Sequence, residues 1–66
     1  MQIVLNGEPR EIERPVTVAE LLEQLGLEPR RVAIEVNEKL VRRQDHARTR
    51  LHEGDRVEIV TLVGGG

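Results

Sequence analysis

Hydrophobic and polar residues alternate at the start of the chain, and this period of two predicts a half-buried β-strand over MQIVLN, residues 1–6. The Asn6-Gly7 pair that follows is typical of a two-residue hairpin turn. Arg10–Glu13 is therefore expected to return as a second strand.

A helix is predicted between Thr17 and Gly26. The segment TVAE is a capping box, in which the side chains of Thr17 and Glu20 each accept a hydrogen bond from the other's backbone amide. Gly26 stands where a left-handed residue ends a helix, and Pro29 prevents its continuation. Apolar residues recur with the spacing of one helical face, at Val18, Leu21, Leu22 and Leu25.

Three further strands are predicted in the second half of the chain, over Val32–Asn37, Lys39–Val41 and Arg56–Val63. A tight turn at Asn37-Glu38 would join the first two. The polar stretch RRQDHARTR, residues 42–50, is expected to be a surface connection with one helical turn, followed by Leu51 as an anchor in the core.

These elements predict an α+β fold, with a single domain over residues 1–66. One amphipathic helix must cover one face of a sheet, and a right-handed crossover through it would make the strands on either side parallel neighbours. The order of elements is typical of a β-grasp protein, a mixed sheet of about five strands with one main helix packed on one face. Residues 64–66 would form the flexible C-terminal glycine tail of this domain.

The last strand predicts an apolar patch on the sheet face that no helix covers. Alternate positions point to opposite faces, and the face away from the helix turns from charged to apolar at Val60 and Leu62, where Val4 is expected to join them. Such a patch is a candidate for docking a partner. Scattered exposed aliphatics are also common on protein surfaces, so both interpretations stay open.

Composition narrows the class of function. The 12 acidic and 10 basic residues are mixed along the chain and give a net charge of −2, unlike the basic surface of a nucleic-acid binder. Aromatic residues are absent, which removes any platform for base stacking. No apolar run reaches membrane-spanning length, and we expect no signal peptide at the N-terminus. We therefore expect a cytoplasmic protein, monomeric when free, that binds neither nucleic acid nor membrane.

Three glycines, Gly64, Gly65 and Gly66, follow the last strand, which at average glycine usage happens by chance in about one chain in 3,000. A glycine tail has no side chains and can enter a channel as narrow as a backbone. From Thr61 onward the chain could extend roughly 20 Å beyond the fold. Either the carboxylate of Gly66 is the working group, or the glycines are a frayed end without function.

A carboxylate is a poor electrophile, so Gly66 would first have to be converted to an acyl derivative with a good leaving group. The sequence has no phosphate-binding loop, no cysteine and no Ser-His-Asp spacing. We therefore expect no catalytic residue, bound cofactor or metal on this chain, and activation of Gly66 by a partner enzyme.

The chain resembles the ThiS family of ubiquitin-like sulfur carrier proteins of thiamine biosynthesis. The resemblance covers nearly all of it and is most specific in the VN hairpin, in EGDRVEIV and in the terminal VGGG. Two positions depart from the family pattern. RPVT replaces a glycine-containing turn before the helix, and Glu38 stands where glycine is common. Both bear on loop shape and leave the tail unchanged.

The resemblance implies that an adenylating enzyme uses ATP and Mg²⁺ to activate the Gly66 carboxylate. A sulfur donor such as a cysteine desulfurase then supplies the sulfur of a C-terminal thiocarboxylate, which thiazole synthase consumes. It further implies that Gly64 and Gly65 thread the approach to both enzymes, and that Val60, Leu62 and Val63 help to dock.

Two weaker signals lie in the polar connection. His46 and His52 are six residues apart, without the clustering that a metal site needs, and are expected to be solvated. Arg42 and Arg43 are candidates for steering the chain onto an acidic partner surface, or are a solvated face.

The tail chemistry leaves other functions open. A sulfur carrier for tRNA thiolation or molybdopterin synthesis, and a ubiquitin-like protein modifier, share the glycine end. A β-grasp binding module with an idle tail is an alternative of another class. Loss of Gly65 and Gly66 would leave a binding module functional but would abolish a carrier.

Overall fold

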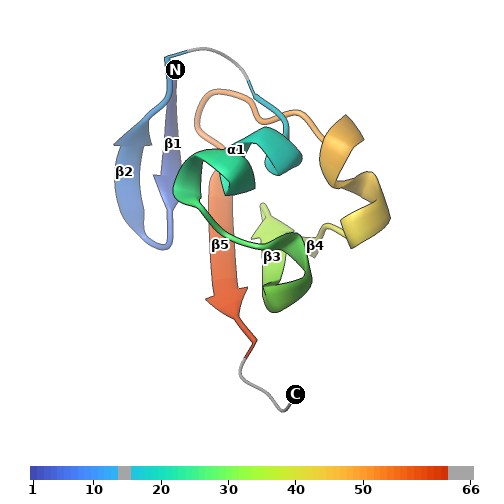
Figure 1. The fold of residues 1–66 in the computed structure, drawn as a ribbon. Helices are drawn as coiled ribbons and strands as arrows, with labels where there is room; N and C mark the ends of the chain where they lie inside the picture. Colours follow the sequence, from blue (N-terminus) through green and yellow to red (C-terminus); the bar gives the residue numbers. More distant parts are fainter. Residues whose placement is uncertain (14–15, 63–66) are drawn as a thin grey trace.

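The computed structural model describes residues 1–13 and 16–62 of the chain. Five strands form one mixed sheet in the order β2-β1-β5-β3-β4, and helix α1 packs on one face of it (Figure 1). This confirms the predicted fold class. The elements are β1 Gln2–Leu5, β2 Glu8–Glu11, α1 Val18–Leu25, β3 Val32–Val36, β4 Lys39–Leu40 and β5 Arg56–Thr61, with two 3-10 helices, η1 Pro29–Arg31 and η2 Arg43–Arg48.

The helix begins and ends where its capping residues predict. Thr17 accepts a hydrogen bond on its side chain from the Glu20 amide at 3.2 Å, and the Thr17 amide donates to the Glu20 carboxylate at 2.8 Å. At the other end Gly26 adopts a left-handed conformation with φ of 70°, and its amide reaches back to the Glu23 carbonyl at 3.0 Å. Both ends of the helix are therefore set by local chemistry.

Replacement of Thr17 by alanine is expected to lower the free energy of unfolding by about 1 kcal/mol, because the Glu20 amide loses its partner at the helix start. Chemical denaturation monitored by circular dichroism measures the change. The exposed variant Gln24→Ala, within the same helix, should stay within about 0.5 kcal/mol of the wild type. Equal stability of the two variants would contradict a capping role.

The prediction that the strands flanking the helix are neighbours is wrong. The last strand, β5, lies between β1 and β3, parallel to β1 and antiparallel to β3. β5 is the longest strand, and its Val57 is fully buried. A central position in the sheet buries more of its apolar surface than an edge position would.

The second strand also begins earlier than predicted, at Glu8 instead of Arg10. Asn6 and Gly7 have φ of 50° and 83°, the conformation of a two-residue turn with both φ values positive. Such a turn pairs Leu5 directly with Glu8, so the strand starts there. Pro9 is tolerated because β2 is an edge strand.

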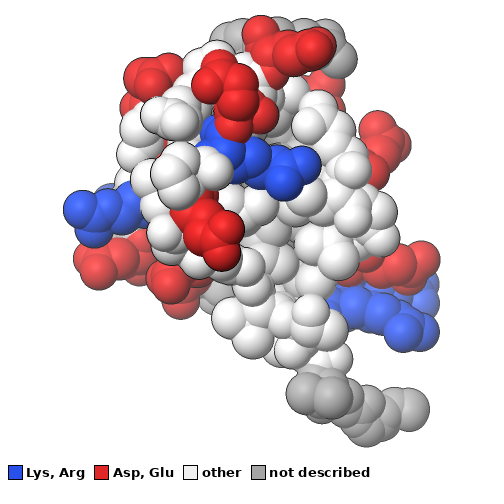
Figure 2. All heavy atoms as spheres, turned by 90° about the vertical axis from the view of Figure 1, so that its left-hand side faces the viewer, with Lys and Arg blue, Asp and Glu red and all other residues white. Residues whose placement is uncertain are grey.

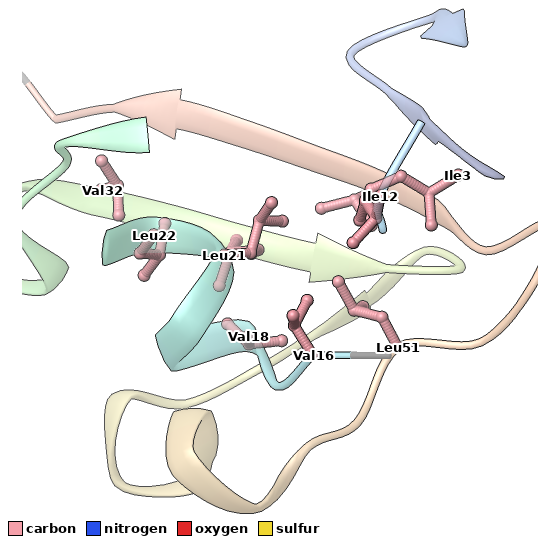
Figure 3. Packing of buried hydrophobic residues seen from close by; sticks show 10 residues of the cluster. Ile3, Ile12, Val16, Val18, Leu21, Leu22, Val32 and Leu51 are labelled. Carbon is pink, nitrogen blue, oxygen red and sulfur yellow. The ribbon is translucent and has the colours of Figure 1, made fainter. Parts of the chain in front are cut away.

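The core consists of aliphatic side chains from both layers. Figure 3 shows Val18, Leu21 and Leu22 of α1 packed together with apolar residues of the sheet and of the connections. Leu51 is buried, as its predicted role as an anchor requires. The buried cluster comprises Ile3, Ile12, Val16, Val18, Leu21, Leu22, Val32, Ile34, Leu51 and Val57.

The expectation that both histidines are solvated is wrong for His46. Its side chain lies in η2, next to α1, and the residue is only 5% exposed. Its Nε2 lies 3.3 Å from the Val41 carbonyl oxygen, to which it donates. The 3-10 helix turns this one polar side chain inward, whereas His52 is exposed as expected.

Candidate functional site

The candidate site is the end of β5, the strand that leads toward the three glycines. Along one edge β5 pairs with β3 from Val57 to Thr61. The pairing continues one residue further, because the Leu62 amide donates to the Arg31 carbonyl at 2.7 Å. The chain is thus held to the sheet through Leu62. Val63, Gly64, Gly65 and Gly66 lie outside the described residues, and so do their predicted roles.

Val60 and Leu62 are exposed, as the alternation of the last strand predicts. They remain 60% and 55% accessible and are among the few large apolar side chains on the described surface. Val57, on the opposite face of β5, is fully buried in the core. We call Val60 and Leu62 the exit patch, since they lie at the point where the described chain ends.

The expectation that Val4 joins this patch is wrong. β1 runs parallel to β5 and pairs with its beginning, where Val4 stands opposite Arg56. Four residues of strand separate Arg56 from Val60, a distance of roughly 13 Å. Val4 therefore lies at the other end of β5 and is itself only partly exposed.

The sequence reading missed a third exposed apolar residue, Leu40 on edge strand β4, which is 65% accessible. Leu40 stands opposite Glu35, and Glu35 stands opposite Glu58, so all three share the sheet face of the exit patch. The two carboxylates separate Leu40 from Val60 along this face. The signal was available in the sequence, since an apolar residue paired with Glu35 across a hairpin must share its face.

Charges on the molecule are mixed in sign. Figure 2 shows acidic and basic side chains interspersed on the β2 side, with uncharged surface at the lower end, where β5 ends in Figure 1. Arg42 and Arg43 are both exposed, and Arg43 lines an open hollow with Glu28, Pro29 and Arg30. The steering role of Arg42 and Arg43 stays a prediction.

The carboxylate of Asp55 stabilises the turn that precedes β5. Asp55 accepts a hydrogen bond from the His52 amide at 2.7 Å and another from the Asn37 side chain at 3.0 Å. Over residues 1–13 and 16–62, no three His, Asp or Glu side chains gather as a metal site would require. In the same ranges no helix has the length and apolarity needed to cross a membrane.

A mixed five-stranded sheet with a central C-terminal strand and one helix on one face defines a ubiquitin-like β-grasp protein. The model of the ThiS family matches residues 3–66, and the chain belongs to this family.

Individual relatives agree with this assignment. The chain is 42% identical over 62 residues to the sulfur carrier protein ThiS of Thermus thermophilus, covering 94% of this chain and 95% of that one. The crystal structure of the thiamine biosynthesis protein ThiS from Geobacter metallireducens superimposes with a TM-score of 0.87 at 30% identity, covering 100% of both chains.

A second kind of relative is larger. The chain is 41% identical over 66 residues to a thiazole synthase of Paramagnetospirillum magneticum, and the match covers 100% of this chain but 20% of that protein. A thiazole synthase of Magnetococcus marinus matches over the same share of its length. The chain therefore spans about one fifth of the first curated relatives it matches.

Proposed function

We propose that the chain is a sulfur carrier in thiamine biosynthesis, whose Gly66 carboxylate is the group that carries the sulfur. The observation that carries the proposal is membership of the ThiS family over residues 3–66, which includes the three glycines. Relatives of nearly the same length bear the name of sulfur carrier protein.

The chemistry requires two partners before any sulfur is delivered. An adenylating enzyme, with ATP and Mg²⁺, joins the Gly66 carboxylate to AMP and releases pyrophosphate. A sulfur donor such as a cysteine desulfurase then presents a persulfide, whose outer sulfur attacks the acyl-adenylate and displaces AMP. A thiol reductant cleaves the S–S bond of the resulting acyl disulfide, which leaves a thiocarboxylate on Gly66. The carrier contributes the carboxylate and the surfaces that dock, while ATP, Mg²⁺ and the catalytic groups belong to the partners.

The geometry of β5 sets how close a partner must come. Because Leu62 is still hydrogen-bonded to the sheet, only the four residues from Val63 to Gly66 remain to span the distance. Four residues reach at most about 14 Å, less than the roughly 20 Å estimated from Thr61 onward. A partner must therefore contact the end of the sheet itself, and the exit patch is the apolar surface available there.

The acceptor that we propose is thiazole synthase. Two thiazole synthases contain a segment similar to the whole of this chain within their own sequence. Such covalent joining raises the effective concentration of carrier and synthase for each other. It supports a direct contact between this chain and a separate thiazole synthase, and favours thiamine over tRNA thiolation or molybdopterin synthesis.

Intact mass spectrometry tests the proposal. After incubation with ATP, Mg²⁺, a cysteine desulfurase with cysteine, a thiol reductant and the adenylating enzyme, the chain is expected to gain the mass difference between sulfur and oxygen. The loaded protein should then return to its original mass with thiazole synthase and its other substrates. An unchanged mass, with an enzyme that loads another carrier in the same mixture, would refute the proposal.

A further inference from the structure

The edge of β5 that faces β1 is only partly covered by that strand. β1 pairs with the first residues of β5, and its last backbone contact is the Asn6 amide, which donates to the Val57 carbonyl at 2.8 Å. At Asn6 and Gly7 the chain turns away into β2. Beyond Val57, the β1 backbone no longer follows β5 toward its exit.

The side chain of Asn6 takes over where the β1 backbone stops. Its Oδ1 accepts a hydrogen bond from the Ile59 amide at 2.8 Å, and its Nδ2 donates to the Ile59 carbonyl at 3.3 Å. A carboxamide offers the same donor and acceptor pair as a peptide group, so Asn6 replaces the strand residue that would come next. Asparagine also tolerates the left-handed backbone that the turn requires at this position.

The stretch of β5 around Ile59 is thereby held along both of its edges. On the opposite edge β5 pairs with β3, where Ile59 stands opposite Ile34, and that pairing extends to Leu62. Val60, the first residue of the exit patch, follows Ile59 directly and is exposed. These contacts hold the last described residues of β5 in the sheet.

We propose that Asn6 is a positioning residue for sulfur loading, which fixes the end of β5 and so aims the glycine tail relative to the docking surface. The effect of Asn6 on sulfur loading rests on the function proposed above. The physical reason is that a misaligned reacting group loses rate steeply, by about 100-fold for a displacement near 1 Å. Only four residues follow Leu62, so the tail has little extra length to correct a displacement of the strand end.

The chain contains a matched control in Asn37. This residue is also exposed, also has a positive φ, of 53°, and also makes two side-chain hydrogen bonds. Its Oδ1 accepts from the Arg56 amide at 3.0 Å and its Nδ2 donates to Asp55. These contacts hold the beginning of β5, at the end far from the exit. The variants Asn6→Gly and Asn37→Gly keep both turns and each remove two hydrogen bonds.

Amide hydrogen exchange of the free protein gives the first measurement. In Asn6→Gly the exchange of the Ile59 amide is expected to accelerate about tenfold or more relative to the wild type, while in Asn37→Gly it stays within about twofold. A second measurement is steady-state sulfur loading by the adenylating enzyme and the desulfurase. Asn6→Gly should lower kcat about fivefold or more with KM within about twofold, whereas Asn37→Gly should change neither.

Unchanged exchange of Ile59 in Asn6→Gly overturns the proposal, and so does a kcat equal to that of Asn37→Gly. A lower kcat at an unchanged KM would show that Asn6 aims the tail and does not dock the partner. The comparison with Asn37→Gly excludes a general loss of folded protein, because such a loss would affect both variants alike. If the wild-type chain is not loaded at all, the proposed function fails. The exchange measurement then still decides whether Asn6 holds the end of β5.

Discussion

Deletion of Gly65 and Gly66 is expected to abolish sulfur loading and to leave the fold intact. The shortened chain ends about 7 Å earlier, which is half of the reach left beyond Leu62, so its carboxylate cannot enter a site built for the full tail. The free energy of unfolding should stay within about 0.5 kcal/mol of the wild type, because the buried core lies between Ile3 and Val57. Intact mass spectrometry and denaturant unfolding measure the two effects.

A variant of unchanged length serves as the control for this deletion. Gly65→Ala keeps the reach and adds one methyl group, so it is expected to slow loading if the approach to the partner's site is narrow, and not to prevent it. A truncated chain that is still loaded at the wild-type rate would refute the role of Gly66. Loss of loading together with unfolding would instead show that the tail supports the fold.

The elements that the sequence predicted best are those whose signals are local. The helix begins at the Thr17 capping box and ends at Gly26 because both devices act within a few residues. Both hairpin turns were also predicted, at Asn6-Gly7 and at Asn37-Glu38. Glu38 adopts φ of 70°, a left-handed conformation that glycine accepts more readily than other residues.

Long-range arrangement was harder to predict. No residue near Arg56–Thr61 in the sequence indicates that this strand inserts between β1 and β3. The central position of the strand is favoured by burial in the complete sheet, which depends on residues far apart in the sequence. The same limitation misplaced Val4, whose neighbour depends on the direction of β1 relative to β5. The start of β2 was predicted two residues too late; the strand begins at Glu8 and includes Pro9, which an edge strand accepts.

The candidate site was predicted in part. The alternation of side chains along the last strand was sufficient to predict that Val60 and Leu62 are exposed. Once one face of a strand is known to be buried, every second residue must lie on the other face. The second role of Asn6 was not visible, since a turn residue gives no sign in the sequence that its side chain bonds to a strand 53 positions away. His46 was misjudged for the same reason: its burial depends on how η2 packs against α1.

The double variant Val60→Asp, Leu62→Asp is expected to raise the KM for loading by about 100-fold, with little change in kcat at saturation. Full burial of a Val or Leu side chain contributes about 1.5–3 kcal/mol, and these two remain 60% and 55% exposed in the free chain. Burying both at an interface would therefore contribute about 2–3 kcal/mol in total. Introducing carboxylates adds a desolvation cost that the partner cannot offset without matching charges.

Leu40→Asp is the control, because Leu40 has the same side chain as Leu62, a similar exposure of 65%, and the same sheet face. Glu35 and Glu58 lie between it and the exit patch, so a partner seated over the end of β5 need not cover it. Its KM should stay within about threefold of the wild type. If Leu40→Asp weakens loading as much as the double variant, docking extends across the sheet to β4. If neither variant alters KM, the tail alone makes the productive contact, and the exit patch has no part in binding.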